Sequence, residues 1–121
     1  MVITDSKKLI EVKREFSKKF PYLKLEFYAK HHEEGEGSEA KLLIDDEHTI
    51  GFARATHQEG DLSIDEHLKV GIFERMFFEK YGLNAQVFRK SGSIWLQTIK
   101  TDEWTLAEQN TRGERSVKQE F

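Results

Sequence analysis

The fold can be read from residues 9–20, which run Leu-Ile-Glu-Val-Lys-Arg-Glu-Phe-Ser-Lys-Lys-Phe. Apolar side chains fall at Leu9, Val12, Phe16 and Phe20, three or four residues apart, which places them on one face of a helix. The same spacing recurs 61 positions later, at Val70, Phe73, Phe77 and Tyr81. The sequence therefore predicts two amphipathic helices with equivalent apolar stripes.

A segment with strand character follows each helix, after a break at Pro21 in one case and Gly82 in the other. Residues 23–30 and 83–90 both alternate between apolar and polar side chains. Each strand should enter a hairpin. In the second half the predicted turn is Ser91-Gly92, which leads into a strand over residues 93–99.

The first half has a longer loop, residues 31–38, before a predicted strand at residues 41–44. Both halves then reach an Asp-Glu-x-Thr sequence, at residues 46–49 and 102–105. Thr105 has capping-box spacing to Glu108, which predicts a short helix over residues 105–111 and a weaker equivalent after Thr49. Short edge strands are also expected before the long helices, at residues 2–3 and 62–64.

These patterns predict an α+β fold made of two helix–strand–strand–short helix units, residues 1–60 and 61–112. The units should form one domain with one antiparallel sheet, the two long helices on one face and a pseudo-twofold axis between them. Residues 113–121 show no periodicity and are expected to form a disordered tail.

Composition limits the classes of function. The 121-residue chain has no Cys, which excludes disulfides, thiolate metal sites and cysteine nucleophiles. It begins without a secretory signal pattern, so a cytoplasmic location is expected. The formal net charge of −3 gives no overall attraction to nucleic acids or to anionic membranes.

Two stretches in the second half, residues 87–96 and 102–110, resemble a group of small uncharacterised bacterial proteins. The resemblance extends over most of the chain. It implies a bacterial, single-domain protein, and it supplies neither an activity nor a site residue.

One face of the predicted second hairpin is aromatic and polar. The predicted turn places Phe88 opposite Trp95, with Tyr28 from the first half nearby. Basic side chains at Arg89 and Lys90 flank these rings. The terminal helix could cover this face, or the face could contact a protein partner or unstacked bases of a single-stranded nucleic acid. The opposite face is predicted to be core, with side chains from Val87, Ile94 and Leu96.

The second long helix carries more apolar residues than its stripe requires. The additional side chains are Ile72, Met76 and Phe78. Either the first long helix or the same helix of a second subunit could cover them.

The loop at residues 31–38 contains two His and three Glu residues that could contact a divalent ion. Consecutive residues of a polar hairpin tip hold ligands poorly, so no metal site is predicted. Residues 35–40 imitate a dinucleotide fingerprint, but the surrounding carboxylates would repel phosphate.

The sequence contains no catalytic motif and implies no cofactor. The leading hypothesis is a non-catalytic protein-interaction module, monomeric or homodimeric. It would use Tyr28, Phe88, Trp95, Arg89 and Lys90, or Ile72 and Met76. The alternatives are a single-stranded nucleic-acid binder and an enzyme whose site residues are dispersed along the sequence.

Overall fold

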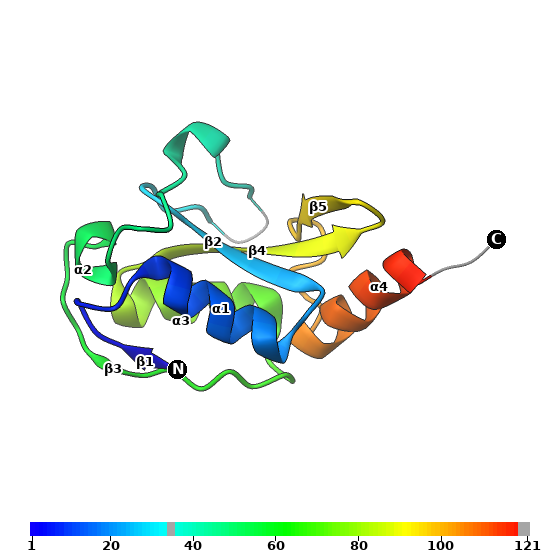
Figure 1. The fold of residues 1–121 in the computed structure, drawn as a ribbon, viewed down its shortest axis with the longest axis horizontal. Coiled ribbons are helices and arrows are strands. Elements are labelled where there is room, and N and C mark those ends of the chain that lie inside the picture. Colours follow the sequence, from blue (N-terminus) through cyan, green and yellow to red (C-terminus); the bar gives the residue numbers. More distant parts are fainter. Residues whose placement is uncertain (34–35, 119–121) are drawn as a thin grey trace.

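The computed structural model describes residues 1–33 and 36–118, which form an α+β fold (Figure 1). The elements are, in order, β1 (Val2–Ile3), α1 (Leu9–Lys19), β2 (Leu23–Tyr28), the 3₁₀ helix η1 (Ala40–Leu42), α2 (Ile50–Ala53), β3 (Gly60–Asp61), α3 (Val70–Tyr81), β4 (Asn84–Ser91), β5 (Ile94–Gln97) and α4 (Leu106–Lys118). The two predicted long helices and the two strands that follow them are confirmed.

The described strands form two antiparallel sheets, so the prediction of a single sheet is wrong. The larger sheet has the order β2-β4-β5, whereas β1 and β3 pair with each other. The second edge strand lies at Gly60–Asp61 instead of residues 62–64. The contact with the N-terminal segment continues one residue beyond β3, where the Leu62 amide donates to the Met1 carbonyl at 2.8 Å.

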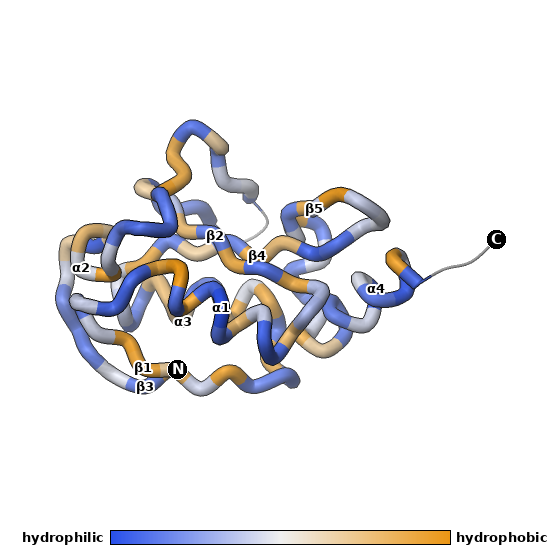
Figure 2. The backbone as a smooth tube through the Cα atoms, viewed as in Figure 1, coloured by the Kyte–Doolittle hydropathy of each residue, from blue (hydrophilic) through white to orange (hydrophobic). Residues whose placement is uncertain are grey.

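Helices α1 and α3 lie side by side below β2 and β4, and all eight residues of their apolar stripes are buried (Figure 1). Hydrophobic and hydrophilic residues alternate along α1, as a one-sided helix requires (Figure 2). The rings of Phe16 and Phe73 stack between the two helices, 5.4 Å apart. The Phe27 ring of β2 packs edge-on against the Phe77 ring of α3, with the ring centroids 5.6 Å apart. One hydrophobic cluster therefore contains residues from both halves of the chain.

Helices α1 and α3 each begin beside the Thr that precedes a later helix. Lys8 forms a bridge with Thr49, and Lys69 forms a bridge with Thr105. The hydroxyl of each Thr accepts a hydrogen bond from the first turn of its helix, from Phe52 N in α2 and Glu108 N in α4. The caps predicted at Thr49 and Thr105 are thus present.

Helix α4 extends beyond its predicted end at residue 111. The expected disordered tail is wrong for residues 113–118, and residues 119–121 lie outside the described part of the chain. Gly113 is buried against Tyr22. The Ser116 hydroxyl accepts from Gly92 N at 3.1 Å and donates to the Lys90 carbonyl at 3.0 Å. Small and polar residues make these contacts, so no apolar stripe marks the second half of α4.

The 3₁₀ helix η1 replaces the first half of the strand predicted at residues 41–44. After η1, the chain bonds to the outer edge of β2, where Ile44 N donates to the Phe27 carbonyl at 2.8 Å and Ala29 N to the Leu42 carbonyl at 2.9 Å. A single bridge joins Tyr28 to Leu43. No helix in the described residues has the length and apolar character needed to cross a membrane.

Candidate functional site

The β4–β5 hairpin turns one residue later than predicted, at Gly92-Ser93, where Gly92 has a φ of 59°. Ser91 therefore lies opposite Ile94, and Trp95 lies opposite Lys90. The predicted pairing of Phe88 with Trp95 is wrong, because Phe88 lies opposite Gln97. The register differs by two residues, so each side chain keeps its predicted face.

Phe88 and Trp95 share one face of the sheet, and both are half-buried. The Lys24 ammonium lies 5.1 Å from the centroid of each ring, and the Lys90 ammonium lies 4.9 Å from that of Trp95. Tyr28 is buried, with 3% of its surface exposed. Burial and the Glu26 charge raise the pKa of Tyr28 to about 12. The exposed aromatic surface is therefore smaller than predicted, and Tyr28 does not contribute to it.

Arg89 lies on the opposite face, which α4 covers over β4 and β2. The expectation that the terminal helix covers Phe88 and Trp95 is therefore wrong. The outer part of the Arg89 face remains open at β5. Ile94 and Leu96 are 56% and 39% exposed instead of forming core.

Packing of α4 brings two arginines to one indole ring. The guanidinium carbon of Arg89 lies 5.6 Å from the Trp104 ring centroid, and that of Arg112 lies 5.1 Å away. Arg89 donates to Gln109 Oε1 at 3.1 Å. Gln109 is fully buried and in turn donates to the Thr101 carbonyl at 2.8 Å. Burial, together with the charge of Arg112, lowers the pKa of Arg89.

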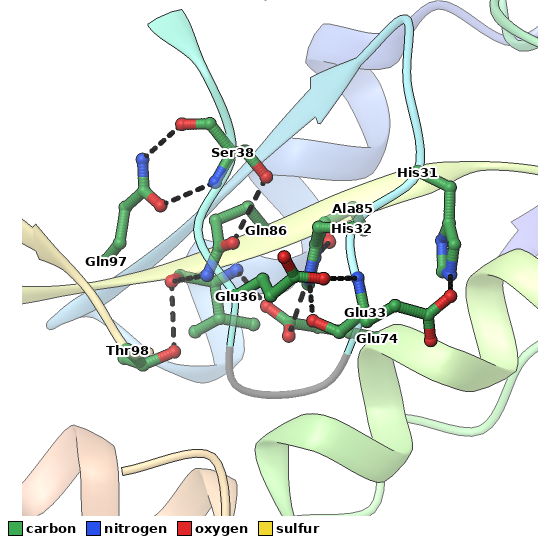
Figure 3. A network of polar contacts seen from close by, with 11 residues as sticks. His31, His32, Glu33, Glu36, Ser38, Glu74, Ala85, Gln86, Gln97 and Thr98 are labelled. Atoms are coloured by element: carbon green, nitrogen blue, oxygen red, sulfur yellow. Dashed lines mark hydrogen bonds and ion pairs between the residues drawn. The ribbon is translucent and has the colours of Figure 1, made fainter. Parts of the chain in front are cut away.

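A pocket of about 280 Å³ lies on the other side of the molecule, between α3 and the segment after β2. Its polar lining includes the buried Glu74 and the half-buried His32 (Figure 3). Glu74 Oε2 accepts from Val87 N at 2.7 Å, and His32 Nε2 lies 3.1 Å from the Ala85 carbonyl. The strand β5 pairs with Phe88–Ser91, so these contacts fall on the part of the β4 edge that β5 leaves uncovered. The two side chains thus bond to backbone groups that a longer neighbouring strand would otherwise meet.

The pairing of His32 with Glu74 was not predicted. Their ring nitrogen and carboxylate oxygen are 3.9 Å apart. In the sequence, Glu74 is an acidic residue among the many apolar residues of the second long helix. Nothing in the local pattern connects it to His32, which lies in a loop far away in the sequence.

The additional apolar residues of α3 are partly covered within the chain. The His31 ring stacks on Phe78 with centroids 3.6 Å apart, and Met76 packs against the core. Ile72 is half-buried. For Phe78, the covering group is a loop side chain and neither of the two predicted helices.

The loop after His32 is tied to the sheet through Ser38. Its backbone amide and carbonyl bond to the side-chain amide of Gln97, both at 2.9 Å, and its hydroxyl lies 3.2 Å from Gln86 Oε1 (Figure 3). The described residues contain no group of three His, Asp or Glu side chains placed to hold a metal ion. Glu34 and Gly35 of the predicted loop lie outside the described part of the chain.

No protein-family model matches the sequence, and neither a curated protein nor a solved structure shows significant similarity to it. The resemblance to small bacterial proteins therefore stays a prediction, and the function has to be inferred from the geometry of the chain itself.

Proposed function

We propose that the chain is a non-catalytic protein-interaction module that self-associates through the outer edge of strand β5. The observation that carries this proposal is an open strand edge without charge. Among the described strands, β5 has β4 as its one neighbour. Residues 91–99 contain no Asp, Glu, Lys or Arg, although charged residues make up 34% of the chain.

The backbone of β5 can accept another strand. Ser91 and Ile94 close a two-residue turn, and such a closing pair exchanges hydrogen bonds. The next pair, Lys90 and Trp95, therefore exchanges no hydrogen bonds. The Lys90 amide instead donates to the Tyr22 carbonyl, on the β2 side of β4, at 2.9 Å. By this alternation, the N–H and C=O groups of Trp95 and Gln97 point away from β4.

A second copy of the chain suits this edge. Exposed strand edges are usually protected by charged side chains, Pro or bulges, and residues 91–99 contain neither charge nor Pro. Two such edges can pair antiparallel without placing like charges opposite each other. The exposed side chains of Ile94 and Leu96 would add apolar contact area on one face of the joined sheet.

We also infer that the two halves are repeats related by a pseudo-twofold axis. The bridges from Lys8 to Thr49 and from Lys69 to Thr105 support this, because their residues also match in the sequence comparison of the halves. In the β2–β4 pair, Glu26 lies opposite Gln86, its sequence equivalent 60 positions later. A local twofold axis between two antiparallel strands would pass through this pair.

The proposed repeats differ where the interaction surface lies. The first half has a four-residue helix α2 and a long loop that bonds to the β2 edge, whereas the second has the 13-residue α4 and the open β5 edge. A duplicated fold does not require these additions, which supports a separate role for them.

The rival functions have less support. A nucleic-acid site would need Tyr28 and Arg89 beside Phe88 and Trp95, but Tyr28 is buried and Arg89 lies on the other face. Glu74 and His32, which line the pocket beside α3, contact the β4 backbone, and these contacts support a structural role for them.

Sedimentation equilibrium tests the proposal. The wild-type chain should dimerise, and Ile94→Lys should weaken dimerisation at least about tenfold by placing a charge at the edge. The Ile94 side chain is exposed, so at a protein concentration where both are monomeric the variant should unfold at the same urea concentration as wild type. Val2→Lys is the matched control, because Val2 is 53% exposed and lies on β1. A monomeric wild-type chain, or Ile94→Lys dimers of undiminished affinity, would contradict the proposal.

A further inference from the structure

Besides its open part at β5, the Arg89 face carries a pair of arginine side chains. Arg89 comes from β4 and Arg112 from α4, and both guanidinium groups lie within 5.6 Å of the Trp104 ring centroid. Arg89 is held in place by the fully buried Gln109. Arg112 is exposed, so a ligand could reach the pair from solvent.

In the part of the chain that the structure describes, no carboxylate forms an ion pair with either arginine of this pair. Arg54 and Arg75 each have a carboxylate within 4.0 Å. Within residues 1–33 and 36–118, no carboxylate oxygen lies that close to Arg89 or Arg112. Glu108, one turn before Arg112, is turned toward the start of α4, where it accepts from Thr105 N at 3.3 Å and Thr105 Oγ1 at 3.2 Å.

Holding two like charges close together costs free energy unless an anion joins them. The charge of Arg112 also acts on Arg89, whose pKa is lowered by burial and then by that charge. The chain has 22 acidic and 19 basic residues, yet within the described ranges no carboxylate oxygen lies within 4.0 Å of either guanidinium group. An external anion is therefore the natural counter-charge.

We propose that Arg89 and Arg112 bind the phosphate group of a phosphate monoester beside Trp104. A phosphate monoester carries about −1.5 to −2 charges at neutral pH, which matches two guanidinium groups, whereas a carboxylate carries one. Guanidinium groups also bond to phosphate oxygens in pairs. Leu96 lies opposite Arg89 in the hairpin and is 39% exposed, so it offers an apolar contact to the rest of the ligand.

This site shares the Leu96 side chain with the proposed self-association surface, but the strand pairing itself uses the outer backbone groups of β5 and neither arginine. The phosphate could belong to a small metabolite or to a phosphorylated side chain of another protein. Both sources present the same dianion, so inorganic phosphate is a valid first probe.

The test is a titration with inorganic phosphate at constant ionic strength, followed through the ¹H–¹⁵N signal of the Trp104 indole, which the Trp104→Phe variant assigns. A saturable shift is expected. Arg112→Gln should weaken binding at least about tenfold, because it removes one charge-assisted contact. Arg115→Gln is the control, since it removes the same charge from an exposed position of the same helix. It should bind phosphate like wild type.

Two further titrations separate the sources and challenge the charge argument. A short phosphoserine peptide that binds at least tenfold more tightly than inorganic phosphate would assign the site to a protein ligand, and equal affinities would assign it to the phosphate group alone. The proposal fails if acetate binds as tightly as phosphate, if no saturable shift occurs, or if Arg115→Gln weakens binding as much as Arg112→Gln.

Discussion

Arg54 carries a positive charge on a side chain with no exposed surface. Its guanidinium donates to Asp5 Oδ1 through Nε at 3.0 Å and through Nη2 at 2.7 Å. It also donates to the carbonyls of Gln58 and Tyr81, at 2.7 and 3.2 Å. A buried charge is tolerated when it is paired and hydrogen-bonded, and Asp5 supplies the pairing. Arg54, which directly follows α2, thus connects Asp5 near the N-terminus to the end of α3.

Replacing Asp5 tests this connection through its pH dependence. Hydrogen bonds from His57 and Arg54 hold the pKa of Asp5 below its usual 3.8. A lowered folded-state pKa contributes stability above pH 3.8, and this contribution is lost as the pH falls through the folded-state value. Asp5→Asn should therefore unfold at a lower urea concentration than wild type at pH 7. The difference should shrink toward zero in strong acid.

The control is Glu59→Gln, which removes a carboxylate from an exposed position of the loop before β3 and should have little effect at either pH. If Asp5→Asn matched wild type at pH 7, Asp5 would not be the counter-charge of Arg54.

At the scale of elements, apolar periodicity was sufficient for α1, α3, β2 and β4, because these elements bury apolar side chains on one face. It failed for α4, whose buried face includes Gln109 and Gly113. It also failed for the register of β5, because a glycine with positive φ can occupy either turn position of a hairpin, and Gly92 takes the first.

Gly113 provides a test of how α4 docks. A Cβ atom at this position would lie 2.8 Å from Tyr22 Cβ and 3.0 Å from the Tyr22 carbonyl oxygen. In an exposed helix, Gly→Ala stabilises by about 1 kcal/mol. Here Gly113→Ala should instead lower the free energy of unfolding by about 1–3 kcal/mol, since it forces α4 away from the sheet.

Urea denaturation measures this change, and Thr111→Ala on the exposed side of α4 is the control, with no loss expected. A Gly113→Ala variant more stable than wild type would mean that α4 is not packed closely against Tyr22.

At the scale of the whole molecule, the two halves share one core, and the aromatic stripes that form it could be recognised from their spacing. The candidate sites could not be recognised from the sequence. The arginine pair depends on α4 bringing Arg112 to a strand residue, Arg89, and the α3 pocket depends on a loop histidine that reaches Glu74. Both are tertiary contacts between segments far apart in the sequence, and no local sequence pattern encodes them.

The open edge of β5 is likewise a property of the assembled molecule, and amide hydrogen exchange tests it most directly. Exchange at Trp95 and Gln97 should slow as the protein concentration rises, because a second copy would cover their outward amides. Exchange at Leu96, whose amide is bonded within the hairpin, should not depend on concentration. If exchange at Trp95 and Gln97 were the same at every concentration, including those at which dimers sediment, association through β5 would be contradicted.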